Sequence, residues 1–255
     1  PKVDEARKLV ALPKPAGVVF ALTPATNPVS TLYYKAILAV LSRNAVIFSP
    51  HPMAKACCNE AASRLEAAAV AAGAPAGLIQ CIEEPSVPLV QALMASSKVQ
   101  VILATGGGPM VRAAYSSGNP AIGVGPGNAP VYIDPDTDQN AAAKRLLESK
   151  SFDNSVLCTN ESVLISQDRD RSRLERALRA NGAHICSDAE VAKLRGWLFP
   201  EGQLNTAAVG KSAVWIAGQA GFRVVPATRV LIAPVAVVGL DEPLSKEKLC
   251  PVLAW

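Results

Sequence analysis

Two kinds of segment alternate along the first 120 residues of the chain. Short runs that are apolar throughout are each followed by a turn rich in proline, glycine or asparagine, and then by a longer helix-like stretch. Strands that are apolar on both faces are typical of a parallel sheet with helices on both sides. The pattern therefore predicts an α/β domain of the nucleotide-binding kind. Its predicted strands are Gly17–Leu22, Ala45–Phe48, Leu78–Ile82 and Val99–Ala104, and its predicted helices are Ser30–Ser42, Ala54–Ala72, Val87–Ala95 and a segment ending near Tyr115.

This alternation of apolar runs and helix-like stretches is interrupted after Pro120. Three glycines fall within Ala121–Asn128, and this stretch is interpreted as a crossing between two subdomains. We place the boundary at residue 127, which gives a cofactor domain of residues 1–127 and a second α/β domain of residues 128–255. The elements predicted for the second domain are strand Pro130–Ile133, helix Asp138–Lys150, strand Ser162–Ile165, helix Arg171–Ala180 and strands at Leu231–Ile232 and Val235–Val238.

Composition and charge narrow the class of partner. Half of the 255 residues are apolar and 18% are charged, so the bulk of the chain is expected to fold. The net charge of +4 comes without a dense cluster of lysine and arginine, and no apolar run is long enough to cross a bilayer. The sequence therefore predicts neither a nucleic-acid partner nor a membrane partner.

The cysteines indicate a reducing compartment. There are six, none of them forms a C-x-x-C pair, and only His51 and His184 could join them in a metal site, so no metal is predicted. Their irregular spacing predicts free thiols in the cytoplasm. Cys57, Cys58 and Cys81 fall in a predicted helix and a predicted strand and are interpreted as packing thiols.

One cysteine has different neighbours. Cys158 lies in the small, polar stretch 151–162, just before an apolar run and after a predicted helix. A free cysteine is most often an inert buried thiol. The polar surroundings also allow a partly accessible thiolate that acts as a nucleophile beside a bound cofactor.

Three turns that follow predicted strands carry further candidates for binding or catalytic residues. Thr105–Gly108 joins a strand to a helix N-terminus, where backbone N–H groups favour a phosphate, although such glycine turns are common. Asn27 precedes a proline and is either a turn residue or an amide donor for an oxyanion. His51 lies between two prolines and is interpreted as a turn residue rather than a catalytic base.

Taken together, these stretches resemble the aldehyde dehydrogenase superfamily, and within it the CoA-acylating branch. The resemblance runs from about Ala16 to Trp255 and implies a Rossmann-type parallel-sheet cofactor domain followed by an α/β catalytic domain, truncated at both ends. The matching segments, in the family's order, are Thr23–Pro28, Arg43–Pro52, Leu103–Gly107, Phe152–Asn154 with Cys158, and Glu247–Pro251.

The resemblance implies a role for each matching residue. Cys158 is the implied nucleophile that attacks an aldehyde, and Asn27 with the backbone N–H of Cys158 is implied to hold the oxyanion. The other matches imply contacts with NAD or NADP. These are Ser49, Pro50 and His51 at the adenosine end, Thr105 and Gly106 near the pyrophosphate, and Glu247 at the nicotinamide ribose.

A missing carboxylate favours coenzyme A as the acyl acceptor. Hydrolytic members carry a Glu-Leu-Gly-Gly-Lys element whose glutamate activates water, and the corresponding run here, Gly123–Asn128, has no acid. A positioned general base contributes about 10²–10⁴-fold, so water attack on the thioester is expected to be slow. A CoA thiolate needs less help, because thioester exchange between two sulfurs is nearly isoenergetic.

Departures from the family pattern leave alternatives open. Met53 stands where close relatives usually place arginine, and Ser155 stands where many have glycine. The alternatives are a hydrolytic dehydrogenase, a catalytically idle piece that binds nucleotide and assembles with partners, and a cysteine acyltransferase without redox chemistry. The resemblance also implies a homo-oligomer in the full-length protein and a cytoplasmic or microcompartment location. The aldehyde and a fused alcohol dehydrogenase domain are not fixed by these residues. The choice of NAD or NADP also stays open, because Lys55 could reach a ribose 2′-phosphate but no acidic ribose-binding residue is evident after the second strand.

Overall fold

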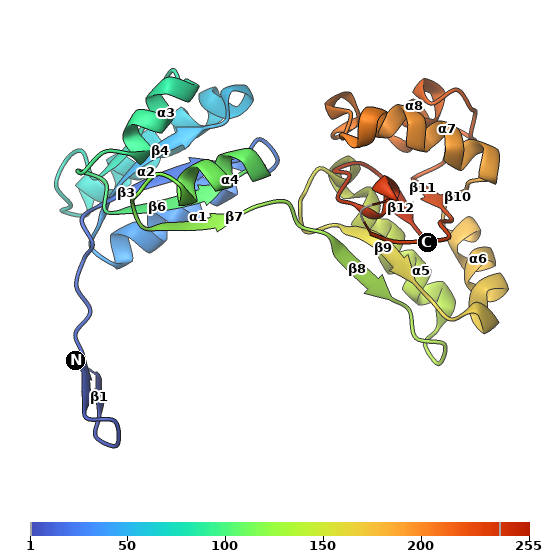
Figure 1. Ribbon diagram of the computed structural model, residues 1–255, viewed down its shortest axis with the longest axis horizontal. Coiled ribbons are helices and arrows are strands. Elements are labelled where there is room, and N and C mark those ends of the chain that lie inside the picture. Colours follow the sequence, from blue (N-terminus) through green and yellow to red (C-terminus); the bar gives the residue numbers. More distant parts are fainter. Residues whose placement is uncertain (1, 240) are drawn as a thin grey trace. The chain divides into compact units, whose positions relative to one another are not determined.

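The computed structural model describes residues 2–239 and 241–255, which form two compact units, residues 1–126 and 127–255 (Figure 1). The first unit ends one residue before the boundary placed from the sequence. Each unit has its own sheet and its own apolar core.

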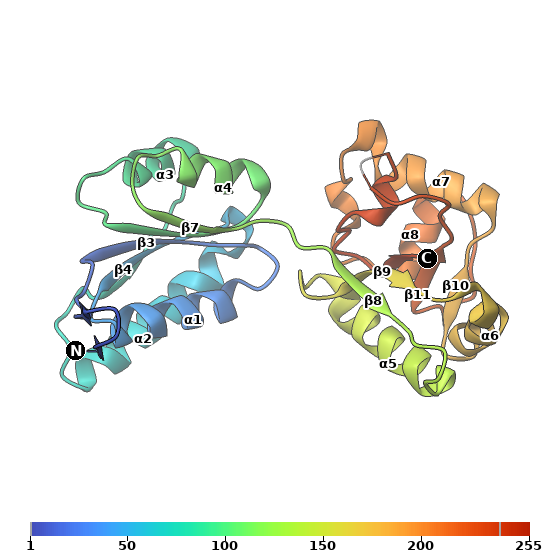
Figure 2. The same ribbon diagram turned by 60° about the horizontal axis from the view of Figure 1, so that its bottom comes forward.

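The first unit is built on a five-stranded parallel sheet in the order β5-β4-β3-β6-β7. Helices α1 and α2 cover one face and α3 and α4 the other (Figure 2). Its elements are β3 (Val18–Thr23), α1 (Pro28–Leu41), β4 (Ala45–Pro50), α2 (Lys55–Ala71), β5 (Ile79–Cys81), α3 (Val87–Met94), β6 (Val101–Thr105), α4 (Gly108–Tyr115) and β7 (Ala121–Val124), preceded by a short antiparallel pair, β1 (Lys2–Asp4) and β2 (Leu9–Ala11).

Strand β3 shows why the strands of this sheet read as unbroken apolar runs. Val19 and Ala21 pack under α1 and α2, whereas Phe20 and Leu22 pack under α3 and α4. Successive side chains point to opposite faces of a strand, so a sheet covered on both sides needs apolar residues at every position. The prediction of a parallel sheet between helical layers is confirmed.

The second unit repeats the plan with five parallel strands in the order β10-β11-β12-β9-β8. Helices α5 and α6 pack on one face and α7 and α8 on the other. Its elements are β8 (Ala129–Tyr132), α5 (Gln139–Ser151), β9 (Glu161–Ile165), α6 (Arg171–Ala180), β10 (Ala183–Ile185), α7 (Asp188–Leu198), α8 (Ala213–Gln219), β11 (Val230–Ala233) and β12 (Val252–Ala254). Short 3₁₀ turns across the two units cover Pro52–Ala54, Phe152–Ser155, Asp168–Asp170, Pro200–Gly202, Thr206–Ala208 and Pro243–Ser245.

Two interpretations of the sequence are wrong in part. Half of the glycine-rich stretch taken as a crossing is strand β7, paired with β6. Gly123 belongs to that strand because a Cβ there would lie 2.6 Å from Cγ1 of Val111 and 2.8 Å from the ring of Tyr115, so the missing side chain is what lets α4 pack. The glycine that suggested a linker therefore serves close packing.

The strand predicted at Val235–Val238 does not form. Pro234 ends the run after β11 because it has no N–H to donate to a ladder, and Val237 and Val238 are exposed. Several elements were not predicted, namely β1, β2, β7, β10, β12, α7 and α8. Of these, α7 has a readable signal, because Ser187 and Glu190 form a capping box at its start.

No helix within residues 2–239 and 241–255 combines the length and the apolarity that crossing a membrane requires.

Candidate active site

The first unit carries its candidate residues where its two central strands end. Strands β3 and β6 are neighbours, and the later strands extend away from them on either side. Such a point, where the strand order reverses, opens a crevice at the carboxyl ends of the strands that commonly binds ligands. The Asn27 loop leaves β3 there, and the Thr105–Gly107 turn leaves β6.

A buried lysine joins these two strand ends. Nζ of Lys35 donates to the carbonyl of Leu22 at 2.6 Å and to that of Leu103 at 2.8 Å, and the side chain is only 5% exposed. Burial lowers the pKa of Lys35 to about 7. Sequence reasoning missed this residue, although a sole charged residue inside helix α1 is a usable signal.

Five predicted cofactor residues line one cavity of about 150 Å³ at this edge of the sheet, and they are Ser49, Pro50, His51, Thr105 and Gly106. Its other walls are largely apolar and include Leu22, Val90 and Met110. The volume is below the roughly 300–1,000 Å³ of clefts that enclose a drug-sized ligand, so it suits one part of a dinucleotide. Gly107 caps the N-terminus of α4, where the helix dipole and the N–H of Gly108 favour a phosphate, whereas Pro109 has no N–H and the N–H of Met110 donates to the carbonyl of Gly107.

His51 is confirmed as a turn residue. Its Nδ1 accepts a hydrogen bond from the backbone N–H of Met53 at 3.2 Å and so caps the 3₁₀ turn Pro52–Ala54. Met53 is 87% exposed. The ring nitrogen of His51 is thus engaged in local structure at the mouth of the cavity.

Asn27 begins helix α1 and lines a second cavity of about 430 Å³ together with Thr105 and Lys35. Its Oδ1 accepts a hydrogen bond from the hydroxyl of Thr26 at 3.1 Å. The Asn27 side chain makes no capping hydrogen bond to the backbone of α1. With Oδ1 engaged, Nδ2 is the group left to donate, as an oxyanion contact requires. Thr105 lines both cavities, so the two candidate subsites of this unit adjoin.

Beside the first cavity, Lys55 is already paired. Its Nζ lies 2.6 Å and 2.7 Å from the two carboxylate oxygens of Glu84. The sequence suggested Lys55 for a ribose 2′-phosphate and showed no acid after the second strand. The acid comes instead from the loop after the neighbouring strand β5.

In the second unit, Cys158 lies half-buried in the turn Leu157–Asn160 just before β9. Three consecutive residues ahead of it, Asp153, Asn154 and Ser155, have left-handed backbones with φ of 46°, 48° and 59°. The left-handed φ of Ser155 is one that glycine adopts freely. Its Oγ accepts a hydrogen bond from Nδ2 of the buried Asn160, which ties the run to the turn of the thiol.

Gly127 lies beside both Cys158 and Glu247. A Cβ on Gly127 would be 3.4 Å from the carbonyl oxygen of Cys158, and the N–H of Gly127 donates to Oε1 of Glu247 at 3.3 Å. Burial raises the pKa of Glu247, and the hydrogen bond from Gly127 and the charges of Lys150 and Lys248 oppose that shift. The loop of the predicted nucleophile and the predicted ribose ligand therefore both lie next to Gly127. Cys158 and Asn27 belong to different units, and their approach to one another stays a prediction.

The other five thiols fall into two groups. Cys58, Cys186 and Cys250 are buried, and burial raises the pKa of Cys81 to about 12, of Cys186 to about 12 and of Cys250 to about 11. The interpretation of Cys57 as a packing thiol is wrong: it is exposed, because α2 turns that face to solvent, and its Sγ donates to the carbonyl of Ala54. Cys57 is therefore the thiol that competes with Cys158 for a soluble reagent.

One set of metal-type ligands comes together in the described part of the chain. The ligand atoms of His184, Cys186 and Glu190 lie within 4.8 Å of one another. Glu190 accepts from the N–H and hydroxyl of Ser187 as the capping box of α7, and it lies 3.0 Å from Nε2 of His184. These contacts are those of a helix cap with a histidine at hydrogen-bond distance.

Comparison with known proteins places these features in a family. The sequence model of the aldehyde dehydrogenase family matches residues 1–185. The bifunctional aldehyde-alcohol dehydrogenase AdhE of Escherichia coli K12 is 43% identical over 251 residues, which are 98% of this chain and 28% of that protein.

Two solved structures extend the match to the fold. The acetylating aldehyde dehydrogenase of Geobacillus thermoglucosidasius superposes with a TM-score of 0.90 at 42% identity, over 94% of this chain and 53% of that one. A propionaldehyde dehydrogenase of Rhodopseudomonas palustris, with bound CoA and an acylated cysteine, gives a TM-score of 0.85 at 34% identity, over 94% of this chain and 55% of that one. The chain thus spans about half the length of these two structures and a smaller share of the bifunctional enzyme. By the family match over residues 1–185, the chain belongs to the aldehyde dehydrogenase family.

Proposed function

We propose that the protein is a CoA-acylating aldehyde dehydrogenase, which converts an aldehyde, coenzyme A and NAD(P)⁺ into an acyl-CoA and NAD(P)H. The proposal rests on family membership and on relatives that are acetylating enzymes or, in one solved structure, hold CoA beside an acylated cysteine. The residues of this chain supply the chemical argument.

The observation that carries the proposal is that the run of chain beside Cys158 contains no carboxylate. Gly127 lies against the carbonyl of Cys158, within the run Gly123–Asn128 that replaces the glutamate-bearing element of hydrolytic members. None of the six residues of this run has a side chain that can take a proton from water. Losing a general base costs about 10²–10⁴-fold, so a thiol acceptor, which ionises far more readily than water, is the better match.

Each residue then has one task. The thiolate of Cys158 adds to the aldehyde carbonyl, and Nδ2 of Asn27 with the N–H of Cys158 donates to the oxyanion that forms. A nicotinamide bound in the first unit would supply the acceptor for the hydride that leaves this carbon. The acyl group stays on the sulfur of Cys158 as a thioester until a CoA thiolate attacks it and regenerates the Cys158 thiolate.

The cofactor and domain assignments belong to the same proposal. Residues 1–127 would bind NAD or NADP through Ser49, Pro50, His51, Thr105 and Gly106, and residues 128–255 would supply the nucleophile and Glu247. The first cavity of about 150 Å³ fits a nucleotide fragment, and the helix dipole at the start of α4 favours a phosphate. We further propose a homo-oligomer for the complete protein and a cytoplasmic or microcompartment location, in keeping with six cysteines that are all free.

Nicotinamide reduction measured with and without CoA tests the proposal. The complete protein should reduce NAD⁺ or NADP⁺ in the presence of an aldehyde only at a low rate until CoA is added, and acyl-CoA should accumulate. Acetaldehyde, propionaldehyde, succinate semialdehyde and sulfoacetaldehyde, each with both nucleotides, form the panel. Robust turnover without CoA would instead identify a hydrolytic enzyme, and CoA exchange without a change in nicotinamide absorbance would identify an acyltransferase.

The role of Cys158 is tested separately. Cys158→Ser should abolish reduction, and retained activity would exclude Cys158 as the nucleophile. Iodoacetamide should alkylate Cys158 rapidly in a Cys57→Ser background, and cofactor should slow the reaction. Uniformly slow labelling would favour a catalytically idle protein.

A further inference from the structure

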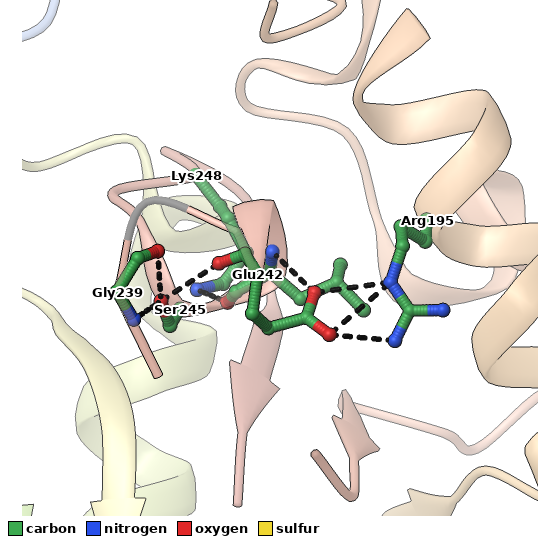
Figure 3. Close-up of polar contacts among 6 residues, drawn as sticks. Arg195, Gly239, Glu242, Ser245 and Lys248 are labelled. Carbon is green, nitrogen blue, oxygen red and sulfur yellow. Dashed lines mark hydrogen bonds and ion pairs between the residues drawn. The ribbon is translucent and has the colours of Figure 1, made fainter. Parts of the chain in front are cut away.

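The segment that presents Glu247 has little regular structure of its own. It returns from β11 to β12, and apart from the 3₁₀ turn Pro243–Ser245 the described residues before β12 form neither helix nor strand. Side-chain hydrogen bonds hold it in place (Figure 3). The position of the Glu247 carboxylate therefore depends on those hydrogen bonds rather than on a strand or helix ladder.

Lys248 supplies the centre of this network. Its side chain is fully buried, and its Nζ donates to the carbonyls of Lys246 at 2.7 Å, Leu244 at 2.7 Å and Ser162 at 2.9 Å. An ammonium group has three N–H donors, and here each one has a carbonyl acceptor. A buried charge is expensive to place and is retained only where its hydrogen bonds are made.

The charges around Lys248 act in both directions. Burial lowers the pKa of Lys248 to about 7, and Lys150 lowers it further, whereas Cys250, Glu242 and Glu247 raise it. Three carbonyl oxygens at hydrogen-bond distance favour the protonated form, because a neutral amine has only two N–H groups.

Two further anchors fix the same segment from its other side. The buried carboxylate of Glu242 receives two-pronged donation from Arg195 of α7, with a shortest contact of 2.6 Å, and accepts from the N–H of Leu244 at 3.0 Å. Ser245 donates to the carbonyl of Glu242 at 2.7 Å, and Nδ2 of Asn128 donates to the carbonyl of Ser245 at 2.6 Å. The segment is thus tied to α7 and to the start of β8.

Among these anchors, the three carbonyls that Lys248 holds link the two candidate functional loops of the unit. Ser162 lies at the start of β9, four residues after Cys158, and Lys246 immediately precedes Glu247. We propose that Lys248 is a positioning residue that fixes the Glu247 carboxylate relative to the Cys158 turn, and so sets where the nicotinamide ribose lies beside the thiol. This inference rests on the proposed function, because it takes Cys158 as the nucleophile and Glu247 as the ribose ligand.

The test compares Lys248→Met with Lys193→Met in the complete protein. Methionine has a similar length and no donor, and Lys193 is an exposed lysine whose Nζ makes one hydrogen bond, to the carbonyl of Gly221. Two reactions are measured. The first is CoA-dependent reduction of NAD(P)⁺ with aldehyde, with KM for the nucleotide. The second is exchange of labelled CoA into acyl-CoA through Cys158, which needs no nicotinamide.

Lys248→Met is expected to raise the KM for nucleotide about tenfold. The substitution leaves three carbonyl acceptors without their donor, and the resulting displacement of Glu247 should weaken nucleotide binding by about that factor. CoA exchange, which uses the thiol but not the ribose contact, should change less than about threefold. Lys193→Met should leave both reactions at the wild-type rate. If Lys248→Met does not fold, Lys248→Gln, whose carboxamide still donates, is judged by the same two measurements.

Two results would overturn the inference. Equal losses in both reactions would mean that Lys248 serves stability alone, and unchanged nucleotide KM would mean that it does not position Glu247. The proposed function fails in a different way, because the wild-type protein would then show neither CoA exchange nor CoA-dependent reduction, and the inference would fall with it.

Discussion

Substitution of Ser155 measures the strain held in the backbone just before Cys158. Asp153, Asn154 and Ser155 are all left-handed, and asparagine and aspartate tolerate that region better than serine does. For most residues the left-handed conformation costs about 1–2 kcal/mol, and glycine adopts it freely. Ser155 is thus the position in the run where glycine should relieve the most strain.

Two variants at this position separate the strain from the hydrogen bond. Ser155→Ala keeps the left-handed strain and removes the Oγ that accepts from Nδ2 of Asn160 at 3.1 Å, which leaves a buried amide donor without a partner and costs about 1–3 kcal/mol. Ser155→Gly loses the same hydrogen bond but relieves about 1 kcal/mol of strain. Ser155→Gly should therefore be about 1 kcal/mol more stable than Ser155→Ala.

Urea unfolding followed by tryptophan fluorescence is the appropriate assay, because all three tryptophans of the chain, Trp197, Trp215 and Trp255, lie in the second unit. A difference of 1 kcal/mol corresponds to a shift in midpoint of about 0.3–1 M urea at typical slopes. Glu201 is a matched control, since it is exposed and also left-handed, with φ of 53°. Glu201→Gly should be more stable than Glu201→Ala by a similar free energy of unfolding. If Ser155→Ala is as stable as Ser155→Gly, the left-handed run stores no strain and the reasoning is wrong.

Three further outcomes are expected. Burial lowers the pKa values of Lys35 and Lys150 to about 7 and 8. Between about pH 7 and 9 the unfolded chain therefore holds protons that the folded chain has released, so the free energy of unfolding should rise with pH, by at most about 1.4 kcal/mol per pH unit for each lysine, and the urea midpoint should rise with it. Above pH 9 buried thiols with raised pKa values reverse the sign, so a midpoint that falls from pH 7 to 8.5 would contradict these buried lysines. Glu84→Gln should lower the KM for NADP⁺ more than that for NAD⁺, about threefold or more, because the carboxylate that pairs Lys55 would repel a 2′-phosphate; equal effects in steady-state assays would place that phosphate elsewhere. Lys35→Met should lower CoA-dependent reduction about tenfold or more by freeing the strand ends that carry Asn27 and Thr105, and an unchanged rate would show that the two carbonyl contacts do not matter for activity.

Much of the architecture follows from the sequence alone. Runs such as Gly17–Leu22 are apolar at every position, which only a sheet buried on both faces requires, so the α/β class is readable without coordinates. The turns at Ser49–His51 and Thr105–Gly106 follow such runs, and the carboxyl ends of parallel strands share one edge. The sequence therefore also brings these cofactor candidates together.

The short strands could not be predicted from the sequence, for a physical reason. Strands β10 and β12 have three residues each, too few for a periodic pattern, and β7 contains a glycine whose purpose is visible only when Val111 and Tyr115 are seen against it. Pairing with a neighbouring strand, rather than local preference, decides whether such segments are strands.

Only the tertiary structure shows which residues hold the candidate site residues in place. Lysine reads as a surface residue in any sequence, yet Lys35 and Lys248 are buried because strand ends and loops present carbonyls that each ammonium group can satisfy. Likewise, Gly127 touches both Cys158 and Glu247 because the chain returns to it after long separations. The sequence determined which groups are suited to the chemistry, and the packing of distant segments determined which groups hold them in place.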